Sequence, residues 1–188
     1  MTITVAPTKS VNYLLPIVLP VWMRGSRHQR VTAGVLDERS ENAFTRGQCF
    51  SIAYALMESL NEEDRARHTV SFITQVNRAG ATHMKSGEFF IHAYLVDDDG
   101  IKFDIMGIES EEEYIESWSS KYSDDTEFRI ERATWDEVRN WEGNHIAQII
   151  NGVPKQRINA ARSFTAAIWD RVQLQAITLG GHNRVWWE

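Results

Sequence analysis

The chain has 188 residues, of which 43% are hydrophobic and 24% charged, and its formal net charge at pH 7 is −6. This length predicts a single domain over residues 1–188 with a core of ordinary size. The negative charge argues against nucleic acid as a partner, because phosphate contacts need clustered lysine and arginine. The single cysteine excludes an internal disulfide framework and a cysteine-rich zinc site.

The N-terminal quarter, residues 1–45, is predicted to be irregular, apart from a possible short strand at Thr2–Val5. The apolar run Val11–Met23 is interrupted by Pro16 and Pro20 and is too short to span a bilayer. No basic segment precedes it as a secretory signal requires. We therefore expect a cytoplasmic protein with no membrane partner. The segment Arg24–Arg30 is interpreted as a basic, solvated loop.

A helix is predicted from Cys49 to about Leu60. Five residues are spaced so that they share one face of this helix: Cys49, Ile52, Ala53, Leu56 and Leu60. Gly47 marks a turn just before it, so Cys49 falls in the first turn, where unpaired N–H groups and the helix dipole favour an anion such as a thiolate. The alternative is a small apolar side chain buried under the helix, which is the usual state of a free cysteine.

Three strands are predicted to follow, at Val70–Val76, Phe89–Val96 and Ile101–Met106. On the second strand, alternate side chains are predicted to point toward the core: those of Phe89, Ile91, Ala93 and Leu95. The opposite face then carries Phe90, His92, Tyr94 and Val96. On the third strand the core set is Ile101, Phe103 and Ile105, and the opposite set is Lys102, Asp104 and Met106.

Matching the two core faces determines the turn at Asp97–Gly100. A three-residue loop, with Gly100 in the left-handed conformation, pairs Leu95 with Phe103 and Tyr94 with Asp104. His92 and Asp104 then lie diagonally on one face, within reach of each other's side chains.

The remaining elements are predicted as a helix at Glu109–Trp118, a strand at Glu127–Ile130 and a helix start capped by Thr134 and Glu137. A long helix is predicted from about Gln156 to Thr178. The core therefore spans about residues 44–135, and a helical part spans about 136–188. The aromatic tail at 184–188 is interpreted as a terminal strand or a cover over the core.

Cys49, His92 and Asp104 together form a candidate catalytic triad. The carboxylate can orient the imidazole, and the imidazole can activate the thiol if the helix start packs against this face. A buried His–Asp pair without function is the alternative. For the oxyanion hole, the Cys49 N–H is one natural donor, and Gln48 or Asn42 is a candidate for the second.

The segment Arg46–Cys49, followed by an apolar helix, resembles the nucleophile motif of the transglutaminase-like branch of the papain-like cysteine enzymes. It is also similar to the Arg-Gly-rich segment of the arylamine N-acetyltransferases in that branch. The strands His92–Val96 and Phe103–Gly107 look like the later His and Asp strands of the family. The resemblance covers about residues 44–108 and implies an α+β, papain-like fold.

We therefore expect a cysteine-dependent acyl-transfer enzyme that hydrolyses, deamidates or transamidates a peptide, protein or small amide. No cofactor is implied, and no metal site either, because His68, His83, His145 and His182 lack metal-ligand spacing. One alternative is a non-catalytic binding or inhibitor protein that keeps this fold. Another is a structural subunit, which an inert and fully buried Cys49 would favour. The oligomeric state stays open.

Overall fold

A computed structural model describes residues 18–23, 27–77, 87–120, 126–150 and 157–167. The fold is α+β, with a two-stranded and a five-stranded antiparallel sheet and several helices. Within these ranges, no helix combines the length and apolar character needed to cross a membrane. The strand predicted at Thr2–Val5, the tail at 184–188 and the end of the long C-terminal helix lie outside the described residues.

The five-stranded sheet has the strand order β6-β5-β4-β3-β7, and each neighbouring pair is antiparallel. Its strands are β3 (His68–Asn77), β4 (Gly87–Asp97), β5 (Ile101–Asp104), β6 (Gly107–Ser110) and β7 (Thr126–Ala133). The strands predicted from alternation are all present in this sheet. Strand β6 was not predicted. The chain reverses over the two turn residues 105–106, and Gly107, with a φ of 122°, is the first residue of β6 and pairs with Asp104.

The hairpin between β4 and β5 has the predicted register, with Leu95 opposite Phe103. Gly100 has the predicted positive φ, 75°. Asp97 builds the turn, because its Oδ1 accepts hydrogen bonds from the backbone N–H groups of Asp99 at 3.0 Å and Ile101 at 2.8 Å. This local hydrogen bonding holds β5 in the register that carries Asp104 toward His92.

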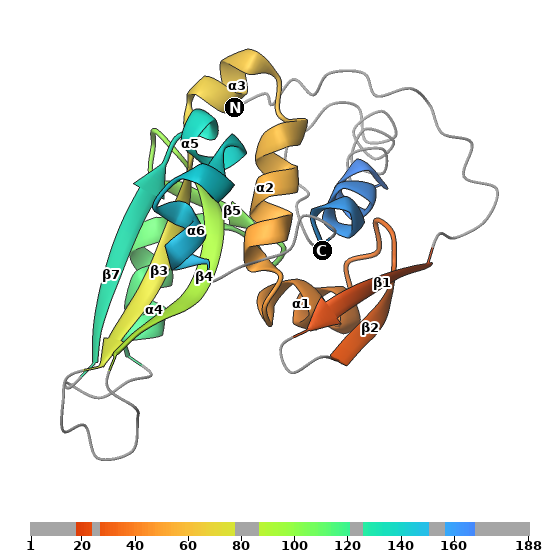
Figure 1. Ribbon diagram of the computed structural model, residues 1–188, viewed down its shortest axis with the longest axis horizontal. Helices are drawn as coiled ribbons and strands as arrows, with labels where there is room; N and C mark the ends of the chain where they lie inside the picture. Colours follow the sequence, from red (N-terminus) through yellow and green to blue (C-terminus); the bar gives the residue numbers. More distant parts are fainter. Residues whose placement is uncertain (1–17, 24–26, 78–86, 121–125, 151–156, 168–188) are drawn as a thin grey trace.

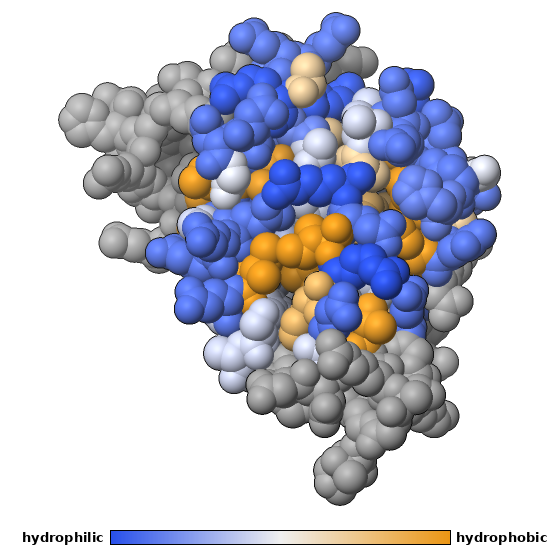
Figure 2. Space-filling view, turned by 90° about the vertical axis from the view of Figure 1, so that its left-hand side faces the viewer, coloured by the Kyte–Doolittle hydropathy of each residue, from blue (hydrophilic) through white to orange (hydrophobic). Residues whose placement is uncertain are grey.

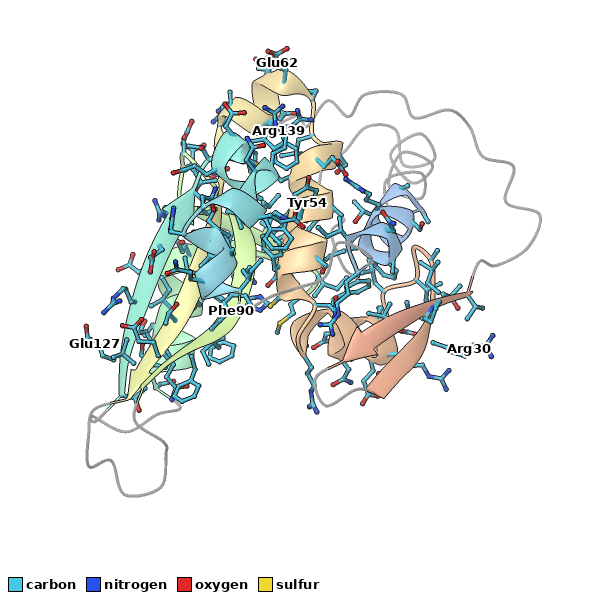
Figure 3. All side chains as sticks on the ribbon, in the orientation of Figure 1. Arg30, Tyr54, Glu62, Phe90, Glu127 and Arg139 are labelled. Carbon is cyan, nitrogen blue, oxygen red and sulfur yellow. The ribbon has the colours of Figure 1, made fainter. Side chains whose placement is uncertain are left out.

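A β-bulge in β4 corrects the predicted faces of Phe90 and Ile91. Ile73 of β3 pairs with His92, and the next residue, Thr74, pairs with Phe90, so Ile91 is the extra residue. The bulge inverts the alternation before His92. Phe90 (labelled in Figure 3) therefore packs against the main core on the α2 side. Ile91 packs against the second cluster on the opposite face.

Helix α2 (Cys49–Ser59) is the central element of the fold, between the five-stranded sheet and a second layer (Figure 1). Its residues from Cys49 to Met57 are all buried, so the single apolar face predicted for it understates its burial. On the sheet side, Phe50 contacts Phe72, with ring centroids 6.1 Å apart. At its C-terminal end, Arg65 donates to the carbonyl oxygen of Met57 at 3.1 Å.

The second layer contains α1 (Glu38–Thr45), the β1–β2 hairpin and a helix at 157–167. Phe44 of α1 and Phe164 of the last helix have ring centroids 4.7 Å apart. Arg162 forms an ion pair with Glu58 at 2.7 Å between NH2 and Oε1, which ties this helix to α2. The described part of the predicted C-terminal helix is thus present and covers α2.

Two strands and a helix lie within 18–23, 27–32 and 38–45, so the prediction of an irregular N-terminal quarter was wrong for these residues. Strands β1 (Val18–Met23) and β2 (Arg27–Thr32) pair with each other, and part of the predicted basic loop is therefore a strand. Val21 and Val31 are buried in the main core. Their burial depends on contacts with distant parts of the chain, which local patterning does not reveal.

The face of the sheet away from α2 is covered by α4 (Glu111–Ser119), which begins two residues later than its predicted first residue, Glu109. A second, smaller core lies between them: Ile73, Tyr94, Val96 and Tyr114. Figure 2 looks at this side of the molecule and shows a band of apolar side chains bordered by polar ones.

The remaining helices are short: α3 (Glu62–Ala66), α5 (Trp135–Arg139), η1 (Trp141–Gly143) and α6 (Ile146–Ile149). The predicted capping box at α5 is confirmed, because Thr134 and Glu137 each bond the other's backbone. Tyr54 of α2 packs against Trp135 of α5 at 5.2 Å between ring centroids (Figure 3). Trp141 of η1 packs against Phe50, the residue after Cys49, at 5.7 Å between ring centroids, so these helices cover α2 from its first turn onward.

Candidate active site

The three residues of the predicted triad lie on three different elements. Cys49 is the first residue of α2, His92 lies in β4, and Asp104 is the last residue of β5. All three side chains are buried, with relative exposures of 1%, 2% and 1% respectively. Gly47, with a φ of 102°, lets the chain turn sharply from α1 into α2 so that Cys49 opens the helix.

The end of β5 creates the space in which His92 meets the other two residues. Strand β5 pairs with β4 only at Leu95 and Val96. Beyond this pairing, toward His92, the edge of β4 is not covered by β5, and α2 packs against β4. The bulge at Ile91 adds local twist at this point. The end of β5, the bulge in β4 and the start of α2 therefore all lie near the imidazole.

His92 and Asp104 form the predicted pair, with 2.8 Å between Nε2 and Oδ2. Cys49 is the other neighbour that favours the protonated ring, and Nδ1 is the ring nitrogen that Asp104 does not use. Burial of the ring opposes protonation. The hydrogen bonds to Asp104 and Cys49, together with their negative charges, outweigh burial and raise the pKa of His92 to about 9. At neutral pH His92 is therefore an imidazolium.

Asp104 is held on both of its oxygens. Besides the bond to His92, Oδ1 accepts the backbone N–H of Met106 at 2.7 Å and lies 3.2 Å from Nζ of Lys102. Burial would raise the pKa of this carboxyl, but the His92 bond and charge, Lys102 and the Met106 N–H lower it below its usual value. Asp104 is therefore a carboxylate oriented by three donors.

Aromatic rings surround the imidazole on its other sides. The ring centroids of Tyr94, Tyr114 and Trp118 lie 6.0, 5.9 and 6.5 Å from that of His92. The planes of Tyr94 and Trp118 are close to parallel with the imidazole, at 25° and 22°. The negative faces of aromatic rings favour a cation, so this environment suits an imidazolium. Tyr114 and Trp118 were not predicted to be neighbours of His92.

The two candidate oxyanion donors have different environments. Gln48, directly before Cys49, is 1% exposed, and its Oε1 accepts from Ser51 Oγ at 3.1 Å. Its Nε2 is buried without a hydrogen-bond partner. Asn42 lies in α1 and donates its amide to the carbonyl of Glu38 at 2.8 Å. A buried amide with a free donor, in the residue directly before Cys49, makes Gln48 the stronger candidate.

Metal-ligating residues are not clustered in the part of the chain that the structure describes, where no group of three or more His, Cys, Asp or Glu could hold a metal ion. His68 bonds the carbonyl of Asp64 at 2.6 Å, and His145 precedes α6. His83 and His182 lie outside the described residues.

Comparison of the chain with protein-family models, with curated proteins and with solved structures gave no significant match.

Protonation of His92 predicts a specific dependence of stability on pH. The pKa of about 9 in the folded state exceeds the ordinary value of 6.5. Between pH 6.5 and pH 9, His92 is therefore protonated in the folded state but not in the unfolded state. The stabilisation of the fold by His92 is complete below pH 6.5 and is lost as the pH rises to 9. A shift of this size corresponds to about 3 kcal/mol.

Urea unfolding at pH 6.5 and pH 9.5 measures this loss. The comparison is made with Cys49→Ala in both proteins, so that the ring cannot take its proton from the thiol. In His92→Gln the side-chain amide can still donate to Asp104 but does not titrate, so the decline over this range should be smaller than with His92 present. An equal decline in both proteins would show that His92 does not titrate in this range.

Proposed function

We propose that this protein is a cysteine-dependent acyl-transfer enzyme on a papain-like scaffold, acting on an amide by hydrolysis, deamidation or transamidation. The observation that carries the proposal is the buried group of Cys49, His92 and Asp104 from α2, β4 and β5, in which His92 bonds Asp104 at 2.8 Å and Cys49 acts on the same ring. The groups occur in the order that nucleophile activation requires: a thiol, an imidazole next to it and a carboxylate that orients the imidazole.

In the proposed reaction the Cys49 thiolate attacks the carbonyl carbon of the amide and forms a tetrahedral intermediate. The C–N bond then breaks, and the His92 imidazolium gives its proton to the leaving nitrogen. A thioester between the acyl group and Sγ remains. Water or a second amine attacks this thioester, His92 accepts the proton of the incoming nucleophile, and the C–S bond breaks with sulfur leaving as the thiolate. The thiolate and the imidazolium are thereby restored. Asp104 keeps the imidazole oriented and stabilises its charged form.

The negative oxygen of the tetrahedral intermediate needs donors beside Sγ. The N–H of Cys49 belongs to the first turn of α2, where backbone donors have no partner within the helix. Gln48 provides no side-chain cap to this helix. Its unpaired Nε2, held in place through Ser51, is the second donor that we assign. An oxyanion at this position would satisfy a buried donor that otherwise has no partner.

A second candidate function, a non-catalytic binding or structural protein, is favoured by the 1% exposure of Cys49. Catalysis requires the side chains that cover the thiol to move when substrate binds. In a non-catalytic protein the same three residues would be a satisfied polar network within the core, and no such movement would be needed.

Acyl-enzyme trapping distinguishes the two functions. The protein is mixed with p-nitrophenyl acetate, quenched in acid and analysed by intact mass and peptide mapping. We expect one acetyl group on Cys49 that disappears with time, and a faster disappearance with an acetylated amine product when an amine is added. If the thiol becomes acetylated or alkylated by iodoacetamide only after unfolding, the non-catalytic function is correct.

A further inference from the structure

Lys102 is a buried cation directly behind the triad. Its side chain is 0% exposed, although lysine is rarely buried unless it is paired. Nζ lies 3.2 Å from Oδ1 of Asp104 and 2.7 Å from Oε1 of Glu109. It also lies 4.0 Å from the ring centroid of Tyr114. The chain thus places a positive charge against the carboxylate that His92 uses.

We propose that Lys102 is a positioning residue of the triad: its ammonium group shares the Asp104 carboxylate with His92 and so limits how strongly this carboxylate holds the proton on the imidazole. The two oxygens of Asp104 are divided between the two cations, Oδ2 on His92 and Oδ1 on Lys102. The electrostatic part of this proposal stands on geometry alone. Its consequence for catalysis rests on the proposed function.

The charged and titratable groups around this pair come from every element packed there. Those facing His92 are Cys49 from α2, Asp104 from β5, Tyr94 from β4 itself and Tyr114 from α4. Those facing Lys102 are Asp104, Glu109 from β6 and Tyr114. Because the site is buried, water and salt screen these interactions weakly. Removing the ammonium group leaves the cluster more negative by one charge, so the imidazole should hold its proton more strongly.

Lys102→Met is a suitable test, because methionine replaces the apolar stem and removes only the charge. Asp104 keeps the Met106 N–H and the His92 bond. Glu109 is 41% exposed, so water can solvate it when the lysine is absent. The titration of His92 is followed by NMR with labelled histidine. We expect its midpoint to rise by about one pH unit relative to the wild type.

Glu109→Gln is the matched variant, in which the change in charge is opposite to that in Lys102→Met: it removes a negative charge and retains the lysine. We expect the His92 midpoint to fall, by less than it rises in Lys102→Met, since Glu109 is partly solvated and does not contact His92. Opposite shifts support an electrostatic role. Shifts in the same direction, or no shift in either variant, overturn it. If Lys102→Met does not fold, the sign of the Glu109→Gln shift decides.

The catalytic consequence is measured separately, as the upper pH limit for hydrolysis of 4-nitroacetanilide, whose leaving aniline needs a proton. This limit should move upward in Lys102→Met and downward in Glu109→Gln. A wild type with no hydrolysis would contradict the proposed function, while the NMR midpoints would still decide the role of Lys102. Hydrolysis with an unchanged pH limit in both variants would contradict the role of Lys102 alone.

Discussion

Cys49→Ala should lower acyl transfer from p-nitrophenyl acetate by roughly 10³-fold or more, because the thioester intermediate can no longer form. The loss in folding stability should be small, about 1 kcal/mol, since alanine keeps the start of α2 and removes one buried sulfur atom. Release of p-nitrophenolate measures the first effect, and urea unfolding measures the second.

Ser51 provides a matched control for this variant, because it is a buried hydroxyl in the same turn of α2 and bonds Gln48 instead of His92. Ser51→Ala should retain the acetyl group on Cys49, with a slower rate because Gln48 loses the bond that orients it. If Cys49→Ala and the wild type release p-nitrophenolate at equal rates, the hydrolysis arises elsewhere on the chain and the acyl-enzyme proposal is wrong.

His92→Ala should lower hydrolysis of 4-nitroacetanilide by about 10²- to 10⁴-fold, because the thiol loses its base and the leaving nitrogen loses its proton donor. Asp104→Asn should lower the rate of this hydrolysis less, by roughly a hundredfold. Asp104 orients the ring and stabilises its charged form, but none of its bonds is made or broken in the reaction. Steady-state rates of the three proteins at pH 7.5 test this order.

The pH dependence separates the two roles of His92. Its pKa of about 9 predicts that anilide hydrolysis by the wild type falls as the pH rises through this value, because the imidazolium loses its proton. Acetylation by p-nitrophenyl acetate should not fall there, since p-nitrophenolate leaves without a proton and the thiolate persists. Parallel profiles for the two substrates would be incompatible with His92 as the general acid.

The sequence by itself predicted the elements that carry the candidate site. Helical spacing after Gly47 located the helix that begins at Cys49, and strand alternation located β4 and β5. The apolar faces required Leu95 to oppose Phe103, which selected the loop with Gly100 in the left-handed conformation and brought His92 and Asp104 to one face. These features are set by local backbone geometry and by side-chain period, and both can be read along a single chain.

Only the tertiary structure decided the features that depend on contacts between distant segments. The bulge that reverses Phe90 and Ile91 arises from the pairing of β4 with β3, and the burial of β1 and β2 arises from packing against α1. Lys102 carries the same sequence signal as any outward-facing strand lysine. It becomes a buried partner of Asp104 because β6 returns Glu109 opposite it and α4 places Tyr114 over it. Burial and pairing are properties of the assembled layers, so the charge next to the triad could not be found from spacing alone.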